Sequence, residues 1–395
     1  MNINTQIHRL LISTLLLATS VFGQNFEQFL SQALQSSPYL KASALDAHKI
    51  KEEGSILLRY KNPSLELEYA SFNPDIGSSD NGYRVNYSQD IRLWDVAADK
   101  TALNKANIEN ADASYALKKA LFTRDISLFY TQYMQTKKLL ILGKQELEIA
   151  KKIYDISLAR YESGSISEGL KLQAQVDFEM VKSLQNTLDL KSLNTYYKLL
   201  GFAGITQDLE LDDSHTFNLV SDADTLQNPS VLLYQTQKNQ ALKEAEVNAN
   251  SIEWINVFAE LENEPEQDIY RLGVNIPLAI FNDKSEEKRI SSLKASQAEL
   301  LVLNEKNRLD IGLIRLQKER VSLLKLNKTN KKILKTELRL LKMYEEGYKI
   351  ANTSLLQLQD IKNKVIQTRE QIIQTDTALN KNAIYTNYNQ GNYNE

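Results

Sequence analysis

Two pairs of short segments in the chain alternate apolar and polar residues with the period of a β-strand. In the first pair, Leu65 and Leu67 alternate with Glu66 and Glu68, and a similar pair lies farther along the chain, from Glu253 onwards. Because successive side chains of a strand point to opposite faces, each pair predicts a hairpin with one apolar and one charged face. Aromatic residues mark the strand ends, namely Tyr83, Trp94, Trp254 and Tyr270.

Strands of about 9 to 11 residues with this alternation and with aromatic ends are typical of a membrane β-barrel wall. The alternative is a soluble sheet on a core, which would need helices to cover its apolar face. Four strands cannot close a barrel, which takes about eight, and unpaired edge amides are costly in lipid. We therefore expect the chain to pool its strands with copies of itself, and a homotrimer would supply twelve strands. Its lumen is predicted to be lined by Glu66, Glu68, Arg84, Asp90, Glu260 and Arg271.

Four long segments keep the apolar spacing of helices. The first, from Val96 to Tyr161, has no proline and a single glycine, and as one helix it would extend roughly 100 Å. After a break near Gly164, a partner segment returns from Glu168 to Leu200, and the second half repeats this arrangement over 284–344 and 354–385. Long periodic helices of this kind are typical of coiled coils. Their remaining polar faces either meet solvent or line a water-filled tube.

The order helix, strand, strand, helix, turn, helix occurs twice, which predicts an internal twofold repeat. The expected fold is mainly α-helical, with a long helical coiled-coil barrel joined to a membrane β-barrel. A short polar start, an apolar run and a small-residue ending predict a signal peptide over 1–23. The two repeats are placed at 24–201 and 228–384, an irregular linker at 202–227, and a flexible tail at 385–395.

Composition narrows the possible functions. The chain has no cysteine, so it can form neither disulfides nor thiolate metal sites, and its formal net charge of -3 argues against a nucleic-acid partner. His48 and His215 are far apart and have no neighbouring ligand spacing. No phosphate-binding glycine loop and no nucleophile elbow is present. We therefore expect no enzyme, no cofactor and no metal site.

The breaks between the long helices carry the most specific residues. The first break reads Arg-Tyr-Glu-Ser-Gly-Ser-Ile-Ser over 160–167 and is followed by Gln-Ala-Gln at 173–175. The second reads Tyr-Glu-Glu-Gly over 344–347, followed by Ser-Leu-Leu-Gln-Leu-Gln-Asp over 354–360. Together with the duplicated order of elements, these residues resemble the TolC-like outer-membrane efflux family. The resemblance covers essentially all of the chain after 1–23.

The resemblance implies a trimer in the outer membrane, in which a twelve-stranded barrel continues into the periplasm as a tunnel of twelve helical columns. It implies a passive exit duct of a tripartite efflux pump, without enzymatic activity. The partners implied are outer-membrane lipid, a periplasmic adaptor (membrane fusion) protein and an inner-membrane transporter of the RND class. No lipidated cysteine can follow the signal segment, because residue 24 is glutamine.

The resemblance also implies site residues at the helix breaks. Asp360 matches the family's aspartate position and is expected to contribute to a periplasmic gate, whereas Gln173 occupies that position in the first copy. When the two glycines are paired, the second copy has about four extra residues between the glycine and this position. The helix tips expected to contact the adaptor contain Gly164, Ser165, Ile166 and Gly347.

Two other classes of protein compete with this interpretation. A periplasmic coiled-coil adaptor, or a structural protein of an efflux or secretion system, would also contain long helical hairpins. An adaptor would need a lipoyl-like half-motif and a soluble barrel domain rich in glycine turns, and neither is visible. A periplasmic enzyme with added helices lacks a candidate site. The pattern leaves the exported substrate open among metal ions, drugs, detergents and polypeptides.

Overall fold

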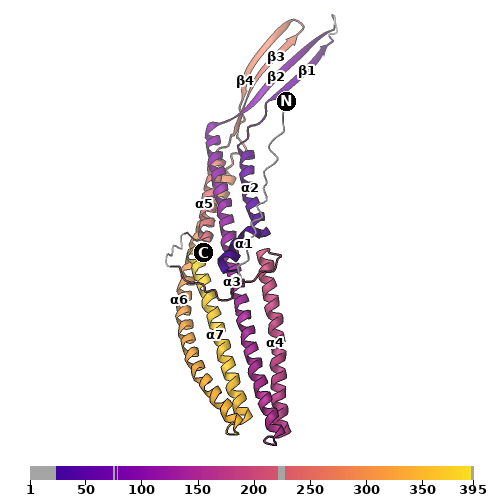
Figure 1. Cartoon of the computed structure of the whole chain (residues 1–395). Helices are drawn as coiled ribbons and strands as arrows, with labels where there is room; N and C mark the ends of the chain where they lie inside the picture. The colour runs from indigo at the N-terminus through magenta and orange to yellow at the C-terminus, as the bar shows by residue number, and fades with distance from the viewer. Residues whose placement is uncertain (1–23, 74–75, 78, 221–226, 393–395) are drawn as a thin grey trace.

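The computed structural model describes residues 24–73, 76–77, 79–220 and 227–392, so the predicted signal peptide lies outside the described residues. The molecule is elongated, with a sheet at one end and two long helical hairpins at the other (Figure 1). In chain order the elements are α1 (Phe26–Ser36), α2 (Pro38–Leu58), β1 (Ser64–Phe72), β2 (Asp80–Arg92), α3 (Trp94–Glu162), α4 (Glu168–Ala203), α5 (Pro229–Asn248), β3 (Trp254–Glu264), β4 (Gln267–Asn275), α6 (Ser285–Lys349) and α7 (Leu355–Asn389).

The element order confirms the predicted repeat: α2, β1, β2, α3 and α4 are followed by α5, β3, β4, α6 and α7. The four strands form one antiparallel sheet in the order β1-β2-β3-β4. The β2–β3 ladder, which pairs Arg92 with Trp254 at one end and Tyr83 with Asn263 at the other, therefore joins the two repeats. Trp94 is the first residue of α3 rather than the end of a strand, because β2 ends at Arg92.

The helices form a single open layer. In the half away from the sheet, α3 lies between α4 and α7, and α7 lies beside α6. In the half nearer the sheet, α3 lies between α2 and α5, and α5 lies beside α6. The layer therefore has one edge made by α2 and α4 and another made by α6. Within the part of the chain that the structure describes, none of the helices combines the length and the apolar character needed to cross a membrane.

Two apolar clusters hold this layer together. One lies midway along the molecule, where Phe26 and Phe29 of α1 pack against Tyr130 of α3. The Tyr130 hydroxyl donates to the main-chain oxygen of Asp212 at 2.6 Å, which fixes the linker to this core. The second cluster lies near the helix tips and combines α3, α4, α6 and α7 around Ile153 and Tyr348. The second cluster contains residues of both helical hairpins, so the hairpins are not independent arms.

Two predicted boundaries shift. Helix α4 continues to Ala203 and ends where Gly204 adopts a left-handed conformation with φ of 72°. Helix α7 continues to Asn389, so the flexible tail predicted from residue 385 is wrong for its first five residues. The reason is burial, since Tyr388 is only 5% exposed. Its main-chain oxygen accepts a hydrogen bond of 2.7 Å from Asn228 Nδ2, which ties the last turn of α7 to the start of α5.

Candidate functional site

The six residues predicted to line a lumen lie on one face of the sheet. Directly paired residues of an antiparallel sheet share a face, and the register pairs Glu68 with Arg84 and Glu260 with Arg271. Arg84 forms an ion pair with Glu68, and Arg271 forms ion pairs with Glu260 and Glu262. The other two predicted residues lie on the same face. Glu66 pairs with Asn86, and Asn86 pairs with Glu260. Asp90 pairs with Asn256, which shares a face of β3 with Glu260. The face is therefore charged and internally paired.

The opposite face of the sheet is apolar and uncovered. One row across all four strands contains Leu67, Val85, Leu261 and Tyr270, paired in that order. Leu67 is 71% exposed and Leu272, in the next row of β4, is 87% exposed. The sheet extends beyond the ends of the helices, so none of the described helices packs on this face (Figure 1). A face of this kind is unfavourable in water and suits lipid.

A buried arginine joins the sheet to the helices. Arg92 donates to the main-chain oxygens of Leu58 and Arg59, both at 3.1 Å, and its Nε donates to Glu253 at 3.2 Å. Its guanidinium also lies 4.4 Å from the centre of the Trp254 ring. These contacts satisfy carbonyl groups that the end of α2 leaves unpaired. This role could not be predicted from the sequence, because a single arginine at the end of a strand carries no distinguishing pattern.

The two helix turns match residue by residue, but not in the way the glycines suggest. Gly164 has φ of 75°, and the corresponding left-handed residue of the second turn is Ala351, with φ of 63°. Ser165 N donates to Arg160 O at 2.8 Å, and Asn352 N donates to Gly347 O at the same distance. Gly347 is therefore the counterpart of Arg160, and the pairing of Gly347 with Gly164 is wrong.

This correction removes the insertion expected in the second copy. Asp360 follows Ala351 by nine residues, as Gln173 follows Gly164. Gly347 lies inside α6, close to its end, and a side chain there would collide with Thr353. Its small size thus allows the turn to fold back on the helix. Gly164, Ser165 and Ile166 lie between α3 and α4, as expected of residues at a helix tip.

Asp360 lies in the second turn of α7, and its side chain is 62% exposed. Its carboxylate accepts a 2.7 Å hydrogen bond from Lys364, one helical turn away. One residue earlier, Gln359 accepts a 3.1 Å hydrogen bond from Gln173 of α4. The predicted gate residue therefore stands beside a contact between the two helical hairpins, with its charge only partly offset within the chain.

Two buried contacts near the tips also link the hairpins. Lys362 is fully buried and donates to both carboxylate oxygens of Asp177. Arg160 donates to the main-chain oxygen of Tyr348 at 2.9 Å and lies over its ring, while Ser157 bonds to the Tyr348 hydroxyl. The sequence placed Arg160 in the motif at the first helix break and predicted no buried role for Lys362. The spacing of Lys362 from Leu358 and Val365 is a signal that could have placed it on the buried face.

Residues 29–204 match the model of the family described as outer membrane efflux protein. The matched segment, which runs from α1 to the end of α4, is similar to that family.

Several solved structures of outer membrane proteins share the fold over most of this chain. The channel-forming protein CusC superimposes with a TM-score of 0.77 at 14% identity, covering 92% of this chain and 91% of that one. The Campylobacter jejuni outer membrane channel CmeC gives a TM-score of 0.75 at 16% identity, covering 93% and 85%. The Vibrio cholerae outer membrane protein VceC gives 0.74 at 10% identity, covering 92% and 95%. No curated protein sequence matches the chain.

Proposed function

We propose that three copies of this chain form a passive channel through the outer membrane, as the exit duct of a tripartite efflux pump. The observation that carries the proposal is the open four-stranded sheet, with an exposed apolar face and a charged, ion-paired face. Strands β1 and β4 each have one neighbour among the described strands. Since unpaired amides are costly in lipid, closure with other copies satisfies both edges.

The helices support the same assembly, because both edges of their layer carry exposed apolar residues. On α4, Leu172, Val176, Met180 and Leu184 recur every four residues and are exposed. On α6, Leu293, Leu300, Ile314 and Val321 fall on a seven-residue spacing and are also exposed. The two edges are different surfaces, so contact between unlike edges produces a closed ring rather than a twofold dimer. Three copies supply twelve strands and a lumen lined by the charged face.

The helix tips are the proposed contact with the partners. In this proposal Gly164, Ser165 and Ile166, together with the turn after Gly347, meet a periplasmic adaptor that connects the duct to a transporter of the RND class. Asp360 of the three chains then forms a ring at the periplasmic entrance. Three carboxylates around one axis repel one another and attract cations or basic groups. Such a ring is proposed to influence whether the periplasmic entrance is open or closed.

The decisive experiment is purification of the mature protein from membranes in detergent, followed by mass measurement and single-channel recording in planar bilayers. The proposal predicts a trimer that dissociates on heating and that conducts ions in a bilayer. A monomer that stays dissolved without detergent would overturn it, because such a protein cannot expose the apolar face of the sheet to water. A periplasmic adaptor would likewise give neither the trimer in detergent nor the conductance.

A further inference from the structure

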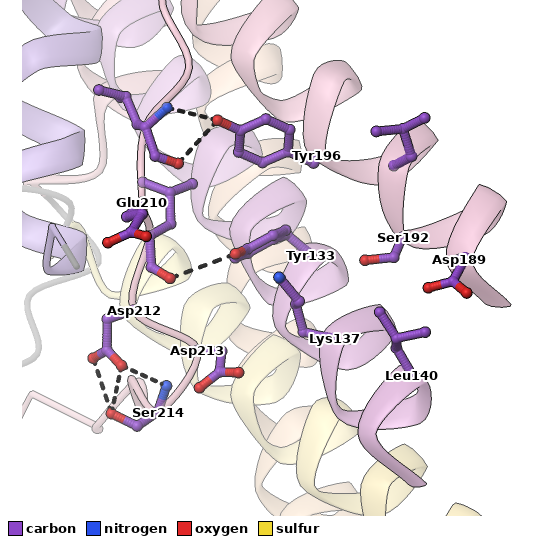
Figure 2. A pocket seen from close by; sticks show the side chains of 13 residues that line it. Tyr133, Lys137, Leu140, Asp189, Ser192, Tyr196, Glu210, Asp212, Asp213 and Ser214 are labelled. Atoms are coloured by element: carbon purple, nitrogen blue, oxygen red, sulfur yellow. Dashed lines mark hydrogen bonds between the residues drawn. The ribbon is translucent and has the colours of Figure 1, made fainter. Parts of the chain in front are cut away.

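A groove of about 800 Å³ opens midway along the molecule between α3, α4 and the linker (Figure 2). Four carboxylates line it: Asp189 of α4, and Glu210, Asp212 and Asp213 of the linker. Within the described ranges none of the four forms an ion pair, and Lys137 is the one basic residue of the lining. We call this feature the acidic groove. It has an excess of negative charge beside the α4 edge of the layer.

The opposite edge of the layer carries the complementary charge. On α6, four lysines line one shallow hollow together with Leu324 and Asn327, which places them on one helix face. All four are exposed, as is the neighbouring Lys325, and none has an ion-pair partner among the residues that the structure describes. This lysine face consists of Lys325, Lys328, Lys331, Lys332 and Lys335.

The acidic groove and the lysine face lie at the same height in the molecule. A side chain on Gly143 of α3 would meet Leu188, the neighbour of Asp189, so these residues are level with one another. Gln145 of α3 borders a hollow that it shares with Leu334 of α6, and Leu334 sits between two of the five lysines. A line across the layer thus connects the lower end of the acidic groove with the lysine face.

The copies in a ring are related by rotation about its axis, and this rotation does not shift a copy along the axis. Two surfaces can therefore meet between neighbouring copies only if they lie at the same height. We propose that the lysine face of one protomer docks against the acidic groove of the next. This inference rests on the proposed trimer and names the surfaces that meet in it. Contact between two α6 edges or two α4 edges would bring like charges together, so this charge pattern also selects the unlike edges.

The first test is disulfide cross-linking of two substituted residues, Asp189→Cys and Lys331→Cys, in the same chain. The natural sequence has no cysteine, so no other thiol can react. Oxidation of the purified trimer is expected to give covalent dimers and trimers on denaturing gels. Each single variant has one cysteine per chain, so it can form at most a covalent dimer. The control combines Asp189→Cys with Lys294→Cys, on the same helix but much nearer the sheet, and is expected to remain monomeric. Equal cross-linking in both pairs, or none in either, would overturn the docking.

The second test reverses charge. Replacing Lys331 and Lys335 with glutamate is expected to lower the temperature at which the trimer dissociates, most strongly at low salt. Adding Asp189→Lys should restore part of the loss, and Lys288→Glu, at the exposed upper end of α6, should change little. A conducting trimer that is insensitive to these changes and gives no cross-link would exclude the docking, but it would not contradict the proposed channel function. Absence of any trimer or conductance in the natural protein would instead refute the proposed function.

Discussion

The ammonium group of Lys362 in α7 donates to both carboxylate oxygens of Asp177 in α4, at 2.9 and 2.7 Å. The lysine side chain is 1% exposed and the aspartate side chain is 22% exposed. A charge at that depth depends on its partner, since an unpaired buried charge is strongly destabilising. The pair therefore fastens the two helical hairpins to each other just inside the tips.

Replacing Lys362 with methionine is expected to destabilise the protein by about 2 to 3 kcal/mol, because it leaves Asp177 near Glu146 without a cation. Thermal unfolding of the hairpins, followed by circular dichroism, measures this loss. The double variant Lys362→Met with Asp177→Asn should recover much of it, because no unpaired charge then remains. A double variant as unstable as the single one would show that packing, and not charge, is what Lys362 contributes.

Glu146 of α3 lies close to this pair and gives a prediction about pH. Burial raises the pKa of its carboxyl group above the usual value, and the nearby Lys362 only partly opposes this effect. A carboxyl whose pKa is raised in the folded state stabilises the fold below its unfolded pKa, and that contribution is lost as pH rises through the folded value. Glu146→Gln should therefore raise the unfolding temperature at neutral pH.

The same variant should show little difference from the natural protein at about pH 3, where Glu146 is protonated in both the folded and the unfolded chain. Unfolding curves at several pH values, with Glu148→Gln as the control on the same helix, test this. A stabilisation by Glu146→Gln that does not depend on pH would argue against titration as the cause.

The two helix turns offer a matched pair of substitutions. Gly164 and Ala351 share a left-handed conformation, but only Ala351 pays the steric cost of a Cβ, about 1 kcal/mol. Gly164→Ala should therefore destabilise the first turn by about 1 kcal/mol, since no atom lies within 4 Å of the added methyl group and only the backbone conformation opposes it. Ala351→Gly should be neutral or slightly stabilising. Denaturant titration measures the free energy of unfolding of both variants. A stabilising Gly164→Ala together with a destabilising Ala351→Gly would contradict the equivalence of the turns.

Asp360→Ala is expected to change the single-channel conductance or the closed lifetime in planar bilayers, with the largest effect at low salt. Removing three carboxylates from one ring weakens cation attraction at the entrance. Lys364→Ala is a useful companion, because it removes the partner of Asp360 and should act in the opposite direction. Unchanged conductance and lifetime in Asp360→Ala would remove this residue from the gate.

Period-two and period-3.6 patterns were sufficient to predict the hairpins, the long helices and the repeat. The charged rows, such as Glu68 beside Arg84, followed from alternation alone, because register across a sheet keeps each face uniform. The turn of the second copy was misplaced because alanine rarely adopts a positive φ, so Gly347 attracted the assignment. The roles of Arg92 and Lys362 depend on partners far away in the chain. Local spacing can place Lys362 on a buried helix face, but it cannot identify Asp177 as its partner.

The ladder between β2 and β3 sets an order of events in biogenesis. It pairs Tyr83 with Asn263, so the first hairpin can find its neighbour only after most of the polypeptide has been synthesised. Pairing between residues so distant in sequence is entropically expensive and slow. Completion of the four-stranded sheet is therefore a late step in the folding of this chain, because β2 has no partner on its second edge until β3 is present.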